Sequence, residues 1–346
     1  MSNPDDGARA PQTELAQLVF GFYVSQAISV AARLGIADVL AAGPLVVDEL
    51  APKVGASPAA LYRLLRALAS VGVFVEDDRR QFGLTPLAER LRSDVPGSYR
   101  AMALLPTEPS FWGPWNELLY SVQTGKTAFR KLYGMDVWEW REKEPEAGRV
   151  FNEAMASNSE GHAEAILRAY DFSGFGHVLD VGGGHGALAA AICKANPDVR
   201  ATVFDLAFVA EGARAFLGAQ GLDRRCDVAA GDMFETIPAG ADAYVFKYII
   251  HDWDDERTLQ LLRTCRKAMD RAAGSLEPRL LVIESVIPTG NGPHPGKLLD
   301  LQMLVSAGGR ERTAEEFATL YRAAGFRLTR VVPTNCPLSV VEGVPV

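Results

Sequence analysis

The sequence predicts an α/β protein in which a doubly wound parallel sheet follows a smaller, mostly α-helical domain. Three observations lead to this fold class. From residue 177 onward short apolar segments alternate with helical ones, a glycine-rich turn follows the first apolar segment, and residues 46–92 read as two helices and two short strands. The apolar segments occupy residues 177–182, 201–206, 241–248 and 279–285. Short, continuous apolar strands that alternate with helices are typical of a parallel sheet buried on both faces.

The segment 46–92 has the pattern of a winged helix–turn–helix. A helix, a turn in which Ser57 is expected to cap a second helix, and two short strands follow one another. This pattern often binds DNA, but its second helix offers only Arg63 and Arg66, and acidic side chains slightly outnumber basic ones over residues 1–100. A DNA-binding domain normally concentrates positive charge. The pattern therefore favours a scaffold or a dimerisation domain.

Residues 13–34 form a predicted helix with apolar side chains all round it. A helix without a polar face needs burial on more than one side, and in a small N-terminal domain we expect a second copy of the chain to provide it, as a homodimer. We expect no apolar stretch long enough to span a membrane. The polar, acidic start of the chain does not resemble a signal peptide.

Length and charge limit the remaining classes of protein. A chain of 346 residues is long enough for two domains, and its formal net charge of −8 argues against electrostatic binding of nucleic acid or anionic lipid. The four cysteines are scattered without metal-ligand spacing, which is typical of free thiols in a cytoplasmic protein.

We expect three regions along the chain. A winged-helix dimerisation domain covers residues 1–97, a helical and aromatic-rich region covers residues 98–175, and the doubly wound catalytic domain covers residues 176–346. The glycine-rich segment 172–176 precedes the first strand of the sheet and is expected to act as a linker.

A nucleotide site is predicted where the first two strands of the sheet end. Gly182 and Gly184 lie in the first turn, where glycine lets the backbone approach a ligand. Asp205 ends the second strand, at the position where an acidic residue accepts hydrogen bonds from ribose hydroxyls. The glycine turn alone is a weak signal, but the two features in this order predict a nucleotide ligand.

Motifs further along the chain carry a resemblance to a known family. The stretches VLDVGGGHGAL, VFDL, GDMF, HDWDDE and GGRERT follow one another in the sequence. With them the chain resembles the class I S-adenosylmethionine-dependent methyltransferases, and more narrowly the plant and bacterial O-methyltransferases related to caffeic acid O-methyltransferase. The resemblance covers nearly the whole chain and implies a Rossmann-like catalytic domain. It also implies S-adenosylmethionine as cofactor and S-adenosylhomocysteine as product.

The resemblance implies which residues hold the cofactor. The glycines border its methionine portion, Asp205 binds the ribose, Asp232 binds the adenine amino group and Lys247 reaches the carboxylate side. Met233 and Phe234 pack against the adenine, although both also suit an ordinary core. The full implied set is Gly182, Gly184, Asp205, Leu206, Gly231, Asp232, Met233, Phe234 and Lys247.

His251 is implied to be the general base that takes a proton from an acceptor hydroxyl. A histidine of ordinary pKa is suited to this task because a phenol is mostly protonated at neutral pH. The base needs an acid that orients its ring, and Glu284, Glu311 and Asp252 all remain open for this role. A metal site in HDWDDE is disfavoured, because Asp254, Asp255 and Glu256 begin a helix, where acids favour the positive end of the dipole.

The acceptor pocket is expected to include one face of a helix, since Phe151, Met155 and Asn158 recur at helical spacing. On spacing alone these residues read as core; the resemblance makes them part of the pocket. The complete expected set is Trp112, Phe151, Met155, Asn158, Tyr248 and Met303. Plant relatives have histidine where this chain has Asn158, so the acceptor is expected to be a small aromatic natural product, as for bacterial relatives.

Two other functions remain open on the sequence alone. One is a transcriptional regulator that uses the winged helix and senses the cofactor. The other is an enzyme of the same fold with diverged chemistry that does not transfer methyl. The sequence does not name the acceptor, the position methylated, or whether the oxygen is phenolic or carboxylic.

Overall fold

The computed structural model describes residues 10–270 and 277–346, apart from the side chains of residues 156, 159 and 160. The opening residues, on which the signal-peptide prediction partly rests, lie outside this range. The chain divides into two compact units. Unit 1 comprises residues 1–112 and 149–157, and unit 2 comprises residues 113–148 and 158–346.

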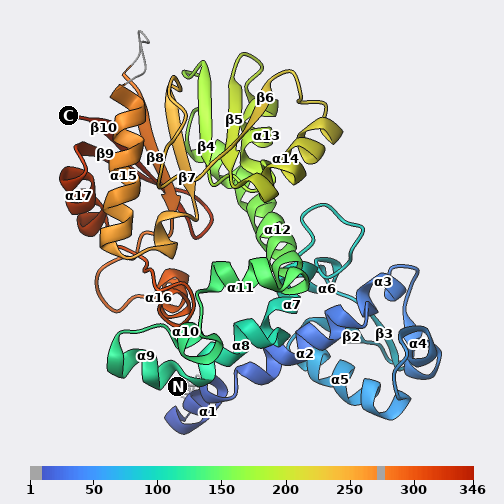
Figure 1. The fold of residues 1–346 in the computed structure, drawn as a ribbon. Coiled ribbons are helices and arrows are strands. Elements are labelled where there is room, and N and C mark those ends of the chain that lie inside the picture. Colours follow the sequence, from blue (N-terminus) through green and yellow to red (C-terminus); the bar gives the residue numbers. More distant parts are fainter. Residues whose placement is uncertain (1–9, 271–276) are drawn as a thin grey trace, which may run out of the picture. The chain divides into compact units, whose positions relative to one another are not determined.

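Unit 1 is mostly helical (Figure 1). Its elements are α1 (Pro11–Val19), α2 (Phe22–Arg33), α3 (Ile36–Leu40), β1 (Leu45–Val46), α4 (Val47–Val54), α5 (Pro58–Ser70), β2 (Phe74–Glu76), β3 (Gln81–Leu84), α6 (Pro86–Glu89), α7 (Arg100–Leu104) and η1 (Leu105–Thr107). The helices α8 (Pro109–Asn116) and α12 (Pro145–Ala169) belong partly to this unit and partly to unit 2.

Segment 46–92 has the predicted order of helix, turn, helix and two strands, and β1 adds a third strand in the order β1-β3-β2. Leu50, Leu61, Leu65, Phe74 and Phe82 are almost fully buried in its core. Ser57 stands at the N-cap of α5, as predicted, but its side chain makes no capping hydrogen bond within the described chain. The predicted N-cap position is therefore confirmed, whereas the side-chain hydrogen bond of a cap is not found in the described chain.

The N-terminal helices expose much of their apolar surface. Leu18 is 80% exposed, and Leu15, Phe20, Phe22 and Tyr23 are also exposed, whereas the buried positions of α2 are small residues near its end. The helical stretch Pro11–Arg33 is, by length and composition alone, apolar enough to cross a membrane. The expectation that no apolar stretch reaches this length is therefore wrong.

Unit 2 contains a sheet with the strand order β6-β5-β4-β7-β8-β10-β9. Its strands are β4 (His177–Val181), β5 (Arg200–Asp205), β6 (Cys226–Ala230), β7 (Ala243–Lys247), β8 (Arg279–Glu284), β9 (Phe326–Pro333) and β10 (Ser339–Pro345). Its remaining helices are α9 (Leu118–Thr124), α10 (Ala128–Tyr133), α11 (Val137–Lys143), α13 (Ala187–Ala195), α14 (Ala207–Ala219), η2 (Ile250–Asp252), α15 (Asp255–Asp270), α16 (Pro295–Val305) and α17 (Ala314–Ala323).

Strands β4 to β8 are parallel, as predicted, and β10 runs antiparallel to both β8 and β9. Side chains alternate between the two faces of the sheet. Leu179 and Val181 pack in the cluster that contains α15 and α17, whereas Val178 packs with Leu188 of α13 and Ile166 of α12. Helices therefore cover both faces, as a doubly wound sheet requires (Figure 1).

The order of the strands determines where a ligand can bind. The chain moves outward from β4 through β5 to β6 and then returns to place β7 on the other side of β4. In open α/β sheets a ligand binds at the carboxyl edge where the strand order reverses, so the ends of β4 and β7 are the expected binding site.

Thr313 and Glu316 form a capping box at the start of α17, a pattern that the sequence shows locally. We expect Thr313→Ala to lower the free energy of unfolding by about 1 kcal/mol, because the amide of Glu316 loses its acceptor. Ser57→Ala at the N-cap of α5 serves as the matched control and should change stability by less than about 0.5 kcal/mol. Urea unfolding followed by circular dichroism measures both variants; equal effects would contradict the assignment.

Candidate active site

The carboxyl ends of three strands bring the predicted polar residues to one edge of the sheet. Asp205 ends β5, Lys247 ends β7 and Glu284 ends β8. The register pairs Val181 with Phe246 and Lys247 with Ile283, so these strands end close to the same level. The switch point between β4 and β7 lies in the middle of this row.

The glycine turn after β4 is shaped by backbone conformations that other residues rarely adopt. Gly182 has φ +68° and Gly184 has φ +58°. A Cβ at Gly182 would lie 2.3 Å from Cδ1 of Ile249, so the turn approaches the loop after β7 closely. The amide of Gly184 donates to Oδ2 of Asp205 at 2.8 Å, and the amide of Leu206 donates to Oδ1 at 2.7 Å. Asp205 is thus fixed against the turn, and a carboxylate has further lone pairs for ligand hydroxyls.

Asp180, which is buried, and Lys247, which is half-buried, interact electrostatically next to this turn. Burial raises the pKa of Asp180 to about 6, although Lys247 partly opposes the rise. Burial lowers the pKa of Lys247 to about 8, with Asp180 acting in the opposite direction. Oδ2 of Asp180 has no hydrogen-bond partner among the described residues. A buried acceptor without a partner suits a ligand that brings a donor, such as an ammonium group.

An aromatic group lies around the loops after β6 and β7. The rings of Phe234 and Trp253 meet edge to face with centroids 4.8 Å apart, and the guanidinium of Arg257 lies 3.8 Å from the centroid of Phe234. Asp232 accepts a hydrogen bond from the amide of Phe234 at 2.8 Å. Met233 and Phe234 are half-buried against the main core, so they form part of its edge.

His251 lies in η2 and is enclosed by acidic side chains. Its Nδ1 is 2.6 Å from Oε1 of Glu311, and its Nε2 is 3.7 Å from Oδ1 of Asp252. Glu284 contacts the backbone instead: its Oε1 accepts from the amides of His251 and Ile249, both at 3.1 Å. Among the three acids proposed for orienting the ring, Glu311 holds it, Glu284 holds the backbone beneath it and Asp252 lies beside the second nitrogen.

These acids determine the pKa of His251. Burial alone lowers this pKa, but Asp252, Glu311 and Glu284 together outweigh burial and raise it to about 9. Burial in turn raises the pKa of Asp252 to about 6 and that of Glu284 to about 7. The His251 imidazole is consequently held in its charged form at neutral pH.

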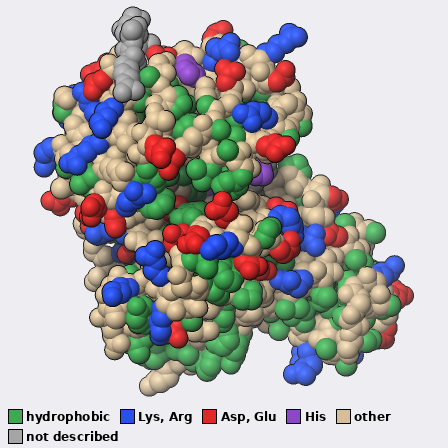
Figure 2. Space-filling model, in the orientation of Figure 1, with side chains coloured by type: hydrophobic (Ala, Val, Ile, Leu, Met, Phe, Trp, Pro, Cys, Tyr) green, Lys and Arg blue, Asp and Glu red, His purple; other side chains and the backbone are tan. Residues whose placement is uncertain are grey.

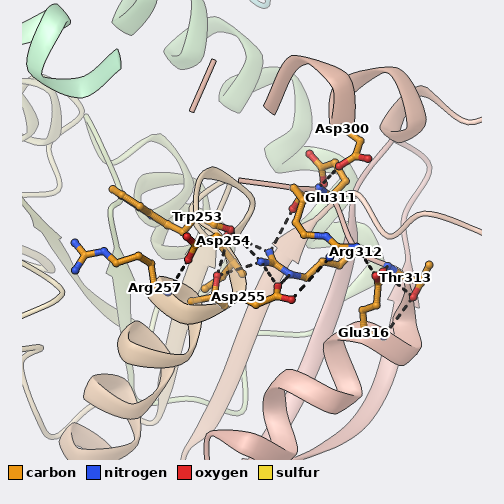
Figure 3. A network of polar contacts seen from close by, with 12 residues as sticks. Trp253, Asp254, Asp255, Arg257, Asp300, Glu311, Arg312, Thr313 and Glu316 are labelled. Carbon is orange, nitrogen blue, oxygen red and sulfur yellow. Dashed lines mark hydrogen bonds and ion pairs between the residues drawn. The ribbon is translucent and has the colours of Figure 1, made fainter. Parts of the chain in front are cut away.

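Arg312 joins the segment that carries Trp253 and Asp255 to the segment that carries Glu311 (Figure 3). Its side chain is fully buried, and it donates to Oδ1 of Asp255 at 2.8 and 3.0 Å. It also donates to the carbonyls of Ile250 at 3.2 Å and Trp253 at 3.0 Å. The guanidinium therefore satisfies carbonyls on both sides of His251 and fixes the loop that precedes α15.

Gly309 makes the close approach of these two segments possible. A Cβ at this position would lie 2.1 Å from the carbonyl oxygen of His251 and 2.3 Å from the amide nitrogen of Trp253. Real Cβ atoms do not come this close to backbone, so any other residue would push the two segments apart.

The predicted acceptor-pocket residues are divided between the two units. Trp112, Phe151 and Met155 belong to unit 1, where Met155 packs beside Leu105, Val150 and Ala154. Asn158, Tyr248 and Met303 belong to unit 2.

Within unit 2 the side chain of Asn158 hydrogen-bonds Tyr248, and the ring of Tyr248 lies 5.2 Å from that of His251. Tyr248 has φ +57°, a conformation that is rare for an aromatic residue and costs backbone energy. Met303 is buried in α16. The structure therefore places Tyr248 beside His251 and Asn158 beside Tyr248.

Several residues at this edge were not singled out from the sequence. Trp253 and Arg312 lie inside the motifs HDWDDE and GGRERT, which provided a signal for them. Asp180 lies within the first predicted strand, and no motif marks it as a ligand. Arg141 of α11 affects the pKa of Asp252, and His162 of α12 lies 6.0 Å from Tyr248 between ring centroids. Neither of these two residues belongs to a recognisable motif.

Comparison with known families identifies the class of protein. Residues 115–327 match the O-methyltransferase domain, and residues 16–94 match the O-methyltransferase dimerisation domain. The chain therefore belongs to the class I S-adenosylmethionine-dependent O-methyltransferases related to caffeic acid O-methyltransferase.

Relatives in this family match over nearly the full length of the chain. A phenazine O-methyltransferase of Lysobacter antibioticus is 45% identical and covers 98% of both chains. The crystal structure of LaPhzM has a TM-score of 0.91 at 44% identity and covers 98% of this chain and 100% of the other. An O-methyltransferase from neocarzinostatin biosynthesis, crystallised with S-adenosylmethionine and 2-hydroxy-5-methyl naphthoic acid, has a TM-score of 0.77 at 34% identity, with coverage of 98% and 100%.

The cofactor of the enzyme is S-adenosylmethionine, and the residues at the sheet edge fit its chemistry. The cofactor carries an ammonium, a carboxylate, a ribose, an adenine and a sulfonium. The glycine turn can approach a ligand closely, Asp180 offers an unsatisfied acceptor, and Lys247 offers a positive charge. Trp253 has a buried indole nitrogen without a hydrogen-bond partner in the described part of the chain.

We expect Gly309→Ala to destabilise unit 2 by more than about 2 kcal/mol, because the added methyl group overlaps the backbone of the His251 loop. Gly292→Ala is the matched control, since a Cβ there meets nothing within 4 Å. Thermal unfolding followed by calorimetry measures both. A Gly309→Ala protein as stable as the control would contradict the close approach described above.

Proposed function

We propose that His251 takes the proton from a hydroxyl of a small aromatic acceptor while that oxygen receives the methyl group of S-adenosylmethionine. The observation that carries this proposal is the arrangement of His251, whose Nδ1 is bound to Glu311 at 2.6 Å. This bond fixes the ring and leaves Nε2 as the nitrogen that can accept a proton.

The acids around the histidine support different parts of this task. Glu311 orients the ring and stabilises the imidazolium that forms when the proton arrives. Glu284 binds the amides of Ile249 and His251 and so holds the η2 backbone. Asp252 lies 3.7 Å from Nε2, where it can also accept from a second polar group on the acceptor. The protein thus supplies a positioned base, and such a base contributes about 10²–10⁴-fold to a rate.

The cofactor supplies an activated methyl group, and the chain supplies its position. We assign the ribose to Asp205, the adenine to Asp232, Met233 and Phe234, and the carboxylate side to Lys247. The backbone around these groups is assigned to four further residues: Gly182, Gly184, Leu206 and Gly231. Holding oxygen, carbon and sulfur in line can lower the barrier by about 7–11 kcal/mol at best. The reaction is expected to be independent of metal.

We assign Asn158, Tyr248 and Met303 of unit 2 to the acceptor. Trp112, Phe151 and Met155 belong to unit 1, and their contact with the acceptor stays an expectation from the sequence. The printed names of the relatives support an aromatic acceptor, since they include a phenazine O-methyltransferase and a complex with a hydroxylated naphthoic acid. We therefore infer that the acceptor is a hydroxylated aromatic natural product with two or more fused rings.

We further infer that the enzyme acts as a homodimer in the cytoplasm. The match of residues 16–94 to a dimerisation domain supports the dimer, and so does the exposed apolar surface of α1 and α2. A second copy of the chain would bury this surface and lower its free energy in water.

The proposal is tested by incubating the enzyme with S-adenosylmethionine and a panel of hydroxylated phenazines, hydroxynaphthoates and simple phenols. Mass spectrometry should detect the gain of one methyl group on a hydroxyl of a fused-ring compound. With that acceptor, His251→Ala should lower turnover by about 10²–10⁴-fold while the cofactor still binds. His177→Ala at the amino end of β4 is the control and should keep wild-type turnover. Undiminished turnover in His251→Ala would contradict the role of the base.

Light scattering after size exclusion should show the mass of a dimer for the wild-type chain. Leu18→Glu should weaken the dimer at least tenfold, because the 80% exposed leucine lies on the apolar surface of α1. Val346→Glu is the control, since Val346 is also well exposed, at 69%, but lies at the other end of the chain. A monomeric wild-type protein would overturn the proposed assembly.

A further inference from the structure

The surroundings of His251 raise a problem for its proposed role. A general base must be unprotonated before it can accept a proton. The His251 ring, however, lies among acids that favour its charged form. Burial lowers the pKa of His251, but the acids outweigh burial and raise it to about 9. In the free enzyme at neutral pH the ring therefore carries a proton on both nitrogens, and it has no lone pair with which to accept another.

We propose that His251 is protonated in the cofactor-free enzyme and gives up this proton to solvent when S-adenosylmethionine brings its sulfonium charge into the site. This inference rests on the proposed function, because it takes His251 as the base. It adds that cofactor binding itself makes the base competent.

The geometry of the charges around the ring carries the inference. Glu311 reaches Nδ1 from the segment before α17, Asp252 lies beside Nε2 from η2 itself, and Glu284 reaches the backbone amide from β8. Oε2 of Glu311 is buried and has no hydrogen-bond partner among the described residues. No second donor there offsets the negative charge of the carboxylate. The backbone amide of Glu311 donates a hydrogen bond to Oδ1 of Asp300, which lies in α16, at 2.8 Å.

The positive groups nearby offset these acids only in part, although Arg312 acts to lower the pKa of Glu284. Arg312 lies behind the loop, where it binds Asp255 and the carbonyls of Ile250 and Trp253. Arg141 of α11 acts on Asp252, and burial lowers the pKa of Arg141 to about 9. Burial holds the pKa of the Tyr248 hydroxyl above its usual range, so this ring adds no charge at neutral pH. The free site therefore has an excess of negative charge around His251.

The chemistry of methyl transfer requires a positive charge near this histidine. Nε2 must reach the acceptor's hydroxyl, and the hydroxyl oxygen must reach the methyl carbon in line with the sulfur. The sulfonium therefore comes within roughly 6 Å of the ring, and two like charges at that distance lower the histidine pKa by about 2 at an effective dielectric constant of about 20. The expected pKa in the complex is then about 7, which suits a base.

The proton balance closes over one turnover. His251 loses one proton to solvent when the cofactor binds, and its Nε2 then accepts the proton of the acceptor hydroxyl. The oxygen–methyl bond forms as the methyl–sulfur bond breaks, and the electron pair of that bond stays on sulfur. The thioether product is neutral, so His251 remains protonated until the next cofactor binds.

The test observes His251 directly by nuclear magnetic resonance, without turnover. The chain has five histidines, so protein labelled with carbon-13 at histidine Cε1 gives few signals, and His251→Gln identifies the signal of His251. Titration of the free enzyme should give a pKa near 9, and the complex with S-adenosylhomocysteine, whose sulfur is neutral, should give nearly the same value. The complex with S-adenosylmethionine should give a pKa lower by about 2.

A second measurement does not depend on the His251→Gln protein. Calorimetry in two buffers of different ionisation enthalpy should show that S-adenosylmethionine releases more protons at pH 8 than S-adenosylhomocysteine does. Glu311→Gln should reduce this difference, because removal of one acid lowers the starting pKa of His251. Since the amino groups of the two ligands also titrate, only the part of the difference that Glu311→Gln changes is assigned to His251.

Two negative results have different meanings. If both ligands bind and the pKa of His251 is the same in the free enzyme and in both complexes, the proposed effect of the cofactor on His251 is contradicted. The proposed role of His251 as the base is not contradicted by that result. If neither ligand binds, the proposed function fails and the inference fails with it.

Discussion

The site depends on one buried guanidinium. Arg312 joins the segment that carries Glu311 to the loop that carries His251, through the carbonyls of Ile250 and Trp253 and the carboxylate of Asp255. A buried arginine is costly unless its donors are satisfied, and here the loop after β7 supplies acceptors for them. The same contact holds the segment of Glu311 against the loop of His251, so one interaction stabilises the fold and keeps the two side chains together.

The acids around His251 have two opposed effects. They orient the imidazole and stabilise its charged form after proton transfer, as a base in an enzyme requires. They also hold a proton on the ring before the reaction, because burial strengthens each charge interaction. In the mechanism that we propose, a cofactor with a positive charge on the reacting sulfur relieves this conflict. The acidity of the site and the charge of the cofactor would then be complementary features of one mechanism.

Much of the catalytic fold was predictable from local patterns. Continuous apolar strands, the glycine turn and the capping box of Thr313 and Glu316 depend on neighbouring residues, and the structure contains all three. The antiparallel edge formed by β9 and β10 was not predicted, since alternation alone does not show in which direction a strand runs. The apolar side chains that α1 and α2 expose fit the expectation that a second copy of the chain covers residues 13–34.

By itself the sequence determined the order of the chemical groups: the glycines, Asp205, Lys247, His251 and the two glutamates all stand in motifs at strand ends or turns. Only the tertiary structure decided which acid serves which atom of His251, because Glu284, Glu311 and Asp252 were equivalent candidates along the chain. Glu311 is sixty residues from His251 and reaches the ring at 2.6 Å, since Gly309 allows the two backbones to touch. The raised pKa of His251 has the same origin: it arises from charges that distant segments bring together, which no local pattern reveals.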